Sequence, residues 1–374
     1  MKREWRKTAG VAAGLLSLLA VTACGGQNQN AAGAAANGNN QGAEATATAT
    51  STAVPTDTAT STNAGGETLT VYLNDFDAVI GEMFEKKSGI KLNIVSGNGA
   101  EIMSRIEAEK GNPQWDVVWI DAMPSIYGLD AKDQLLTGWT PENVAGLKDN
   151  YESLIPEDGS YYPTGAHASG IIVYNKTTVK GTDIPASWED LKKAAYKGKL
   201  GMADPAIAAP AYPFVASFFE DKGMDGGKEY FNHLMEQGLR VYPKNPQVVQ
   251  ALTSGEIDIA ALQESNAYSM LSAGEPVELV WPEEGAPASV RVAAIQKNTD
   301  KADAAKQFVS FLLEPEVQQE LIDSGDESYF EPSAEGATPK ADRAKGAKLN
   351  FTDAAYASEH EAEIKQWFAD QAVQ

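Results

Sequence analysis

Cysteine and histidine are both scarce in this chain of 374 residues. A single cysteine, Cys24, excludes an intrachain disulfide and a thiol-based metal cluster. The 3 histidines, His167, His233 and His360, form no His-Glu-x-x-His motif, and no Gly-x-Ser-x-Gly sequence occurs. Acidic residues are plentiful, so a catalytic carboxylate pair stays open. We nevertheless expect a protein that is not an enzyme.

Positive charge is also in short supply. The chain has 30 Lys and Arg against 52 Asp and Glu, a formal net charge of -22. This balance excludes nucleic-acid binding through a basic surface and argues against adhesion to anionic lipid headgroups. After the first residues, no apolar run is long enough to cross a bilayer.

The first 23 residues have the pattern of a secretion signal. A basic start (Met1–Lys7) precedes a short apolar stretch (Thr8–Ala20), and Cys24 follows Val21-Thr-Ala. This arrangement resembles a bacterial lipobox, which implies that Cys24 is lipidated and becomes the new amino terminus. We therefore expect a lipid anchor on the extracellular face of the cell membrane. The alternative is a cleaved signal that leaves an idle cysteine.

Residues 24–66 differ sharply in composition from the rest of the chain. Asn, Gln, Ala, Thr, Ser and Gly dominate after Cys24, and no aromatic residue occurs between Trp5 and Tyr72. Such a segment buries too little apolar surface to offset the entropy of ordering. We interpret it as a disordered linker between the lipid and a folded domain.

The remaining residues alternate between strand and helix patterns, which predicts an α/β fold with helices on the faces of the sheets. The length suits two lobes with separate cores. We predict one lobe from 67–168 with 289–325, a second from 169–288, and a C-terminal helical segment over 326–374. The chain is expected to cross between lobes twice, near Thr164–Gly170 and at Ser289–Ile295.

The pattern also predicts two helices, a bend and the character of the C-terminal segment. A helix is expected over Phe76–Lys87, and a second over Trp188–Ala195, capped by Ser187. Small residues at Thr164–Gly170 predict a bend. After Glu316 we expect mostly short helices joined by loops.

Polar residues follow several predicted strands, at the edge of the sheet where ligands bind in open α/β folds. Two groups of candidates follow predicted strands: Ser96, Asn98 and Gly99 in one place, and Glu264 and Tyr268 in another. Asp204 and Tyr212 lie around the start of a predicted long helix, and His167 lies at the first crossing. Free N–H groups at helix starts suit anions and polar ligand atoms. Ordinary βα turns, a Ser/Asn-capped helix and a buried core Tyr are the competing interpretations.

Several phrases of the sequence resemble one family. They are Ser96-Gly-Asn-Gly-Ala-Glu, Gly111-Asn-Pro-Gln-Trp-Asp-Val-Val-Trp119, Ile172-Val-Tyr-Asn175, Pro185-Ala-Ser-Trp-Glu-Asp-Leu191, Lys197-Gly-Lys-Leu-Gly-Met-Ala-Asp-Pro205, Val280-Trp-Pro-Glu-Glu-Gly285 and Ala304-Ala-Lys-Gln-Phe-Val-Ser-Phe-Leu-Leu313. In this order they resemble the extracellular solute-binding proteins of bacterial ABC importers, in the branch of ferric-iron, phosphonate and sugar-phosphate binders. The resemblance covers Thr68 to about Gly325.

The resemblance implies a type II periplasmic-binding-protein fold whose two lobes close on a ligand. It implies a monomer that performs no catalysis and hands its ligand to a membrane permease driven by an ATPase. A tethered sensor that presents ligand to a receptor is the alternative.

For the ligand, the resemblance favours ferric iron, carried as cargo and held by Tyr268 and Glu264; no other cofactor is expected. The alternatives are an anion such as a phosphonate or sugar phosphate, held near Ser96–Gly99 and after Asp204, or a mixed polar solute. The mixed solute would contact Asn98, His167, Glu264 and Tyr212.

Overall fold

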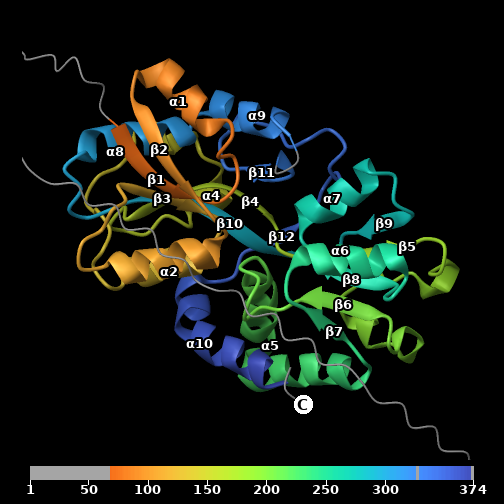
Figure 1. The fold of residues 1–374 in the computed structure, drawn as a ribbon. Coiled ribbons are helices and arrows are strands. Elements are labelled where there is room, and N and C mark those ends of the chain that lie inside the picture. The colour runs from red at the N-terminus through yellow and green to blue at the C-terminus, as the bar shows by residue number, and fades with distance from the viewer. Residues whose placement is uncertain (1–67, 326–327, 372–374) are drawn as a thin grey trace, which may run out of the picture. The chain divides into compact units, whose positions relative to one another are not determined.

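The computed structural model describes residues 68–325 and 328–371 (Figure 1). The predicted signal peptide (1–23), Cys24 and the linker (24–66) lie outside the described residues. Two β-sheets, each covered by helices, organise the described chain, which confirms the two-lobe α/β prediction. Among the described helices, none combines the length and apolar character that a membrane span requires.

The larger sheet forms lobe one. Its order is β11-β4-β10-β3-β1-β2, with β12 beside β10. The strands are β1 (Thr68–Leu73), β2 (Lys91–Ser96), β3 (Val117–Ile120), β4 (Tyr161–Ala168), β10 (Ala286–Ile295), β11 (Glu331–Pro332) and β12 (Leu349–Asn350). β1, β2 and β3 are parallel, whereas β10 runs antiparallel to both β3 and β4. The carboxyl ends of the three parallel strands therefore share one edge.

Helices cover both faces of this sheet because its strands are apolar on both sides. One face packs against α1 (Ile80–Ser88), α8 (Ala302–Leu312) and α9 (Pro315–Asp323) around Phe84 and Phe308. The other packs against α2 (Gly99–Glu109) and α3 (Met123–Asp130) around Ile106 and Ile126. The short helices η1 (Val144–Gly146) and α4 (Asp149–Glu152) precede β4.

The smaller sheet forms lobe two. Its order is β7-β6-β8-β5-β9, with bounds β5 (Ile171–Asn175), β6 (Leu200–Ala203), β7 (Arg240–Tyr242), β8 (Ile259–Leu262) and β9 (Val277–Val280). The covering helices are α5 (Ala211–Glu236), α6 (Asn245–Ser254), α7 (Glu264–Ser272) and the short η2 (Gly181–Asp183), η3 (Glu189–Lys192) and η4 (Ala194–Tyr196). α5 contains a break at Gly223, whose φ is 71°.

The chain crosses between the two sheets twice in the predicted places. β4 belongs to lobe one and β5 to lobe two, so Ser169 and Gly170 make the first crossing. β10 returns the chain to lobe one. The backbone N–H and the hydroxyl of Ser169 both donate to the Pro287 carbonyl, each at 2.8 Å, which ties the two crossings together.

The C-terminal segment contacts both lobes. β11 pairs with β4, and β12 pairs with the start of β10. α10 (Ala354–Gln371) then packs against α3 of lobe one and α5 of lobe two (Figure 1). Its Ile364 and Phe368 are buried in the core of lobe two.

Four local predictions need correction. α1 begins at Ile80 rather than Phe76, because Asp75 and Phe76 have left-handed φ angles. The Trp188–Ala195 prediction forms the two 3-10 helices η3 and η4, although Ser187 does cap, accepting a bond from the Asp190 N–H at 3.1 Å. β4 stays extended to Ala168 before the chain turns. The chain after Glu316 holds two strands and the 18-residue α10 rather than mostly short helices.

Candidate functional site

A cavity lies where the strand ends of the two lobes meet. The empty space in and around it, including space open to solvent, is about 330 Å³, and the fully enclosed part is much smaller. Its lining comes from lobe one, from lobe two and from the segment after α9: Asp75, Phe76, Gly165, Ala166, His167, Gln263, Ser265, Arg291, Tyr329 and Phe330. Charged, polar and aromatic side chains therefore share one small enclosure.

The loop after β1 is held in an uncommon backbone conformation at this cavity. Asp75 and Phe76 have φ angles of 62° and 58°, in the left-handed region that L-residues seldom occupy. Strain of this kind collects at binding sites, where the surrounding structure enforces it. Here Arg291 of β10 enforces it, since its Nη1 donates to the Asn74 carbonyl at 2.5 Å and its Nη2 pairs with Asp75. The guanidinium also lies over the rings of Phe76 and Trp119, 5.3 and 5.2 Å from their centroids.

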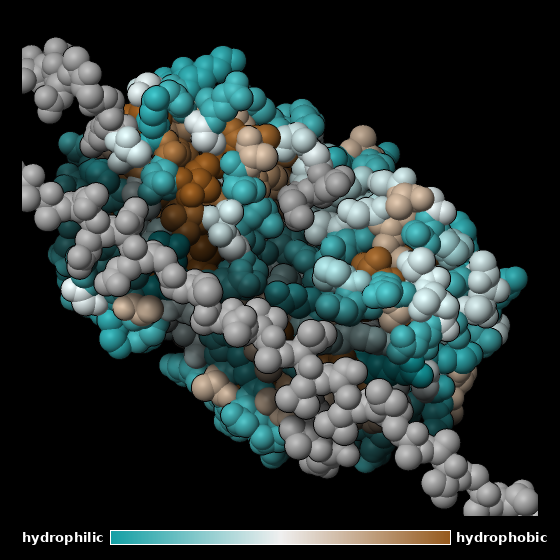
Figure 2. Space-filling model, in the orientation of Figure 1, coloured by the Kyte–Doolittle hydropathy of each residue, from teal (hydrophilic) through white to brown (hydrophobic). Residues whose placement is uncertain are grey.

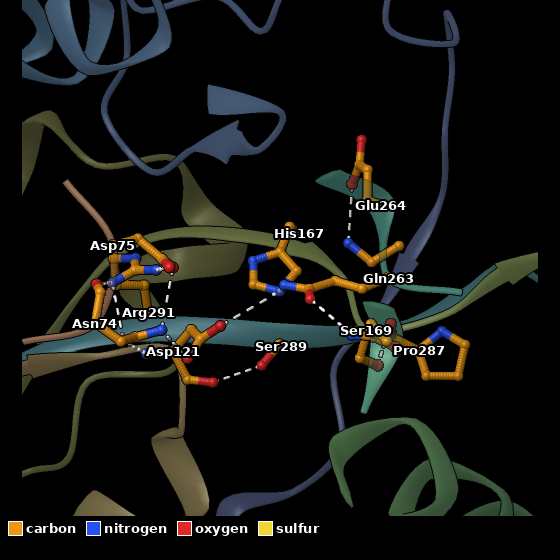
Figure 3. A network of polar contacts seen from close by, with 12 residues as sticks. Asn74, Asp75, Asp121, His167, Ser169, Gln263, Glu264, Pro287, Ser289 and Arg291 are labelled. Carbon is orange, nitrogen blue, oxygen red and sulfur yellow. Dashed lines mark hydrogen bonds and ion pairs between the residues drawn. The ribbon is translucent and has the colours of Figure 1, made fainter. Parts of the chain in front are cut away.

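Asn74 joins two carboxylates beside the cavity. Its side-chain amide donates to Asp75 Oδ2 at 3.1 Å and to Asp121 Oδ1 at 2.7 Å (Figure 3). Asp121 follows β3, and only 3% of its surface is exposed. Its second oxygen, Oδ2, accepts no hydrogen bond from any described residue. Burial, followed by the charge of Asp121, raises the pKa of Asp75, and Arg291 opposes that rise.

His167 connects the two lobes across the cavity. Its Nε2 lies 3.5 Å from Asp121 Oδ2 in lobe one and 3.1 Å from Gln263 Nε2 in lobe two (Figure 3). Gln263 is positioned in turn by Asn245, whose amide donates to its Oε1 at 3.0 Å. A polar chain thus runs from the end of β3 to the end of β8, through the crossing strand β4.

Glu264 is fully buried and bonded within the protein. Arg343 of the C-terminal segment donates to both carboxylate oxygens, at 2.5 and 3.2 Å, and the Ala168 N–H donates at 2.9 Å. Arg343 also bonds Glu331 at 2.9 Å and lies over Trp281. Glu264 therefore links the end of β4, lobe two and the C-terminal segment.

Tyr268 is stacked on Tyr329, with ring centroids 4.2 Å apart and planes within 6°. The Tyr268 hydroxyl accepts from the Ala344 N–H at 2.8 Å, and the Tyr329 hydroxyl donates to Asp342 at 2.7 Å. Burial raises the pKa of Tyr268, and burial together with the Asp342 contact raises the pKa of Tyr329 to about 12. Both phenols are thus held in the neutral form.

The other predicted residues do not line the cavity. Ser96 is exposed at the end of β2. Asn98 caps α2 in a capping box with Glu101. Gly99 faces lobe two, since a Cβ placed on it would lie 3.4 Å from the Ala209 Cβ. Asp204 Oδ1 accepts from the Ala206 N–H at 2.8 Å, and the Tyr212 hydroxyl bonds the Ala357 carbonyl of α10. Their roles as ligand contacts stay predictions; of the eight, His167 alone appears among the residues that line the cavity.

The sequence analysis missed the residues that contribute most charge to the cavity. Asp75 and Asp121 each follow a parallel strand, and this position at a strand end is the same signal that identifies Asp204 and Glu264 as candidates. Arg291 lies inside an otherwise apolar strand, where a lone charge indicates a buried partner. That partner, Asp75, is 216 positions away, and nothing local identifies it.

Comparison with known proteins places the chain in a family. A family model described as bacterial extracellular solute-binding protein matches residues 124–360. A putative 2-aminoethylphosphonate-binding periplasmic protein of Salmonella typhimurium is 25% identical over 282 residues, covering 74% of this chain and 78% of that protein. The spermidine/putrescine-binding periplasmic protein of the same organism is 26% identical over 260 residues, covering 65% and 71%.

Solved structures share the fold. Iron-bound HitA from Pseudomonas aeruginosa superposes with a TM-score of 0.71 at 22% identity, covering 81% of this chain and 99% of that one. The shared architecture is the type II periplasmic-binding-protein fold. Proteins of this kind bind small solutes and work with ABC permeases. The chain belongs to the bacterial extracellular solute-binding protein family.

Proposed function

We propose that this chain is the lipid-anchored capture subunit of an ABC importer, and that its ligand is a small polar organic solute. The observation that carries the proposal is the cavity between the two strand-end edges, which combines the charges of Asp75 and Arg291 with the aromatic rings of Phe76 and Phe330. Apolar walls with a few oriented polar groups are typical of sites for organic ligands. Both sequence relatives described above are named for organic solutes.

Ferric iron was the favoured ligand from the sequence, and the contacts of its expected donors speak against it. Glu264 is occupied by Arg343, and Tyr268 is bonded to Ala344 and stacked on Tyr329. Ferric iron binds oxygen donors in their ionised form, whereas burial raises the pKa of Tyr268. Among the described residues, no group of three or more His, Cys, Asp and Glu is placed to hold a metal ion. We therefore favour the organic-solute alternative.

The proposed mechanism is closure of the two lobes on the solute, biased by its contacts with both. His167 and Gln263 already make a contact between the lobes, and Gly99 approaches Ala209 in a second place. A solute that bonds to both edges stabilises the closed arrangement, which a permease then recognises. No catalytic step is proposed. The anchor at Cys24 and a monomeric state belong to the same proposal.

A thermal-shift panel on the purified protein tests the ligand class. Ferric citrate, sodium citrate, phosphate, 2-aminoethylphosphonate, fructose 6-phosphate, putrescine and spermidine are the probes. A ligand that binds only the folded state raises the unfolding midpoint as its concentration rises. We expect at least one organic probe to do so, and ferric citrate to act no differently from citrate. A shift with ferric citrate alone would restore iron, and no shift with any probe would contradict the proposal.

A matched pair of histidine variants locates the binding site. His167→Asn removes a side chain that lines the cavity, whereas His233→Asn changes an exposed histidine of α5 that bonds the Lys192 carbonyl. We expect the first variant to weaken binding of the active probe about tenfold or more and the second to leave it unchanged. Equal effects would place the site elsewhere.

A further inference from the structure

We infer that the solute carries a protonated amine, received by the carboxylates of Asp75 and Asp121. The inference rests on the proposed function, because it names the chemical class of the solute for that same cavity. Three features of the described residues support it: the charge balance, the unused oxygens and the aromatic wall.

The charge balance is negative once Asp121 is counted, which is buried behind His167 and does not itself line the cavity. Asp75 and Asp121 contribute two carboxylates, and Arg291 contributes the one permanent positive charge among the groups that contact them. The nearby acidic residues Glu264 and Glu331 are balanced separately by Arg343 and Lys148. The guanidinium of Arg291 already donates to Asp75 and to the Asn74 carbonyl, so it is not free to bind an anionic solute. One negative charge beside His167 thus lacks a permanent counter-charge.

Acceptor oxygens are available on both carboxylates. Asp75 lines the cavity, and the bonds from Asn74 and Arg291 both reach its Oδ2, so neither of them occupies Oδ1. Asp121 Oδ2 is buried and accepts no hydrogen bond from the described residues. An unsatisfied buried acceptor is costly, and the cost is greater for a charged group. An ammonium group supplies three donors and the missing positive charge at once.

His167 controls access to Asp121. Its Nε2 is the group nearest the free oxygen, at 3.5 Å, and Gln263 of lobe two holds the same nitrogen at 3.1 Å. When the lobes separate, Gln263 moves away from His167, and the imidazole is released from one of its two contacts. A solute amine that enters the open cleft then reaches Asp121 beside His167, and the imidazole, Gln263 and Ser265 remain to contact the rest of the solute.

The aromatic wall favours the same charge. Phe76 and Phe330 meet edge to face, with centroids 5.9 Å apart, and both line the cavity. The Arg291 guanidinium already lies over Phe76, which shows that this wall accepts a cation. The methylene carbons of an alkylamine would pack against the same rings.

The test compares each amine with its hydroxyl analogue. The pairs are 2-aminoethylphosphonate with 2-hydroxyethylphosphonate, and putrescine with 1,4-butanediol; calorimetry on the purified protein gives the dissociation constants. We expect the amine of at least one pair to bind about tenfold or more tightly than its analogue, because a charge-assisted bond to a buried carboxylate is lost. The pair that responds also shows whether an aminophosphonate or a diamine is the better fit.

Asp75→Asn and Asp121→Asn are the site variants, and Asp77→Asn, an exposed residue two positions from Asp75, is the matched control. We expect either site variant to reduce the preference for the amine over its analogue, and the control to keep it. The ratio of the two affinities, amine over hydroxyl analogue, is measured within one variant, so a general loss of stability does not change it. If one site variant fails to fold, the other still tests the inference.

Two outcomes separate the inference from the proposed function. If fructose 6-phosphate or a hydroxyl analogue binds as tightly as any amine, the proposed function stands and the amine inference fails. If ferric citrate alone binds, both fail. An amine preference that survives in both Asp75→Asn and Asp121→Asn also overturns the inference.

Discussion

The two lobes have the same sheet topology but use their strand ends differently. In lobe one, along the order β2-β1-β3-β10-β4, the first three strands are parallel, β10 runs opposite to them, and β4 runs opposite to β10. The order β7-β6-β8-β5-β9 repeats this pattern in lobe two. The acidic residues at the ends of β1 and β3 lie beside the cavity, whereas Glu264 after β8 is sealed by Arg343. The carboxylates at the strand ends of lobe one thus have oxygens that a solute can contact. The carboxylate of Glu264 in lobe two is instead paired with Arg343 and holds the C-terminal segment in place.

Two arginines make this difference concrete. Arg291 pairs with Asp75, whose side chain is 24% exposed, and Arg343 pairs with Glu264, whose side chain is 0% exposed. Figure 2 shows a visible face on which hydrophilic residues predominate. A partly exposed carboxylate exchanges its partner for water more readily than a buried one. A sealed carboxylate has no such alternative. We therefore expect the arginine–carboxylate pair Arg291–Asp75 to serve binding and the pair Arg343–Glu264 to serve stability.

The largest expected effect comes from Arg343→Gln. The change leaves Glu264 buried without its counter-charge, and we expect a loss of about 3–5 kcal/mol in the free energy of unfolding, measured with denaturant. The double variant Glu264→Gln with Arg343→Gln removes both charges and should recover part of that loss. A loss below about 1 kcal/mol for the single variant would contradict the assigned role.

Arg291→Gln makes the same chemical change at the other edge. Because Asp75 is partly exposed and gains water in the variant, we expect a smaller loss of about 1–3 kcal/mol in the same measurement. Amine binding should change in this variant and stay unchanged in a folded Arg343→Gln protein. Equal losses of stability from the two arginine changes would remove the distinction between the edges.

Gly99→Leu probes closure between the lobes. The added side chain meets Ala209, since a Cβ alone would already lie 3.4 Å from its Cβ. Because Gly99 is buried, we expect a loss of about 1–3 kcal/mol in the free energy of unfolding. In the protein that stays folded, we expect the affinity for the active solute to fall about tenfold. Ala100→Leu, at the exposed neighbouring position, is the control. Unchanged affinity in Gly99→Leu would mean that binding needs no approach of Gly99 to Ala209.

The smallest expected effect is a pH dependence of amine binding. Burial raises the pKa of Asp75, and Asp121 adds to the rise while Arg291 and His167 oppose it. Acid therefore protonates Asp75 earlier than an ordinary carboxyl, and the neutral form no longer attracts an ammonium group. We expect the affinity to fall several-fold from about pH 7.5 to about pH 5. Asp75→Asn should flatten this pH profile. The same amine is used with the wild type and the variant, so the titration of the amine itself affects both profiles equally. Affinity that rises in acid would contradict the role of Asp75.

The sequence predicted the elements whose signals are local. β1 alternates and β6 runs apolar between turn residues, and both patterns are local features of the sequence. Small residues over Thr164–Gly170 indicated a crossing in this region, although the turn itself is confined to Ser169 and Gly170, because β4 stays extended to Ala168. The left-handed pair Asp75–Phe76 could not be predicted, because neither residue is Gly and its conformation depends on Arg291.

The site was harder to predict than the fold, because its chemistry depends on partners far apart in sequence. Glu264 is an obvious strand-end candidate, yet Arg343, 79 positions later, occupies it. The sequence around Asn98 suits both a ligand-binding loop and the start of a helix, and in the structure Asn98 caps α2. Strand order decides which ends meet at the cavity, and that order is a property of the assembled sheet.

Hydrogen exchange on solute binding tests the central claim most directly. The purified protein, with and without saturating 2-aminoethylphosphonate or putrescine, whichever shifts the melting midpoint, is followed peptide by peptide. If both strand-end edges grip one solute, peptides over Asn74–Phe76 in lobe one and over Gln263–Ser265 in lobe two gain protection at the same solute concentration. Protection confined to one lobe, or found only outside these segments, would contradict a single site between the lobes.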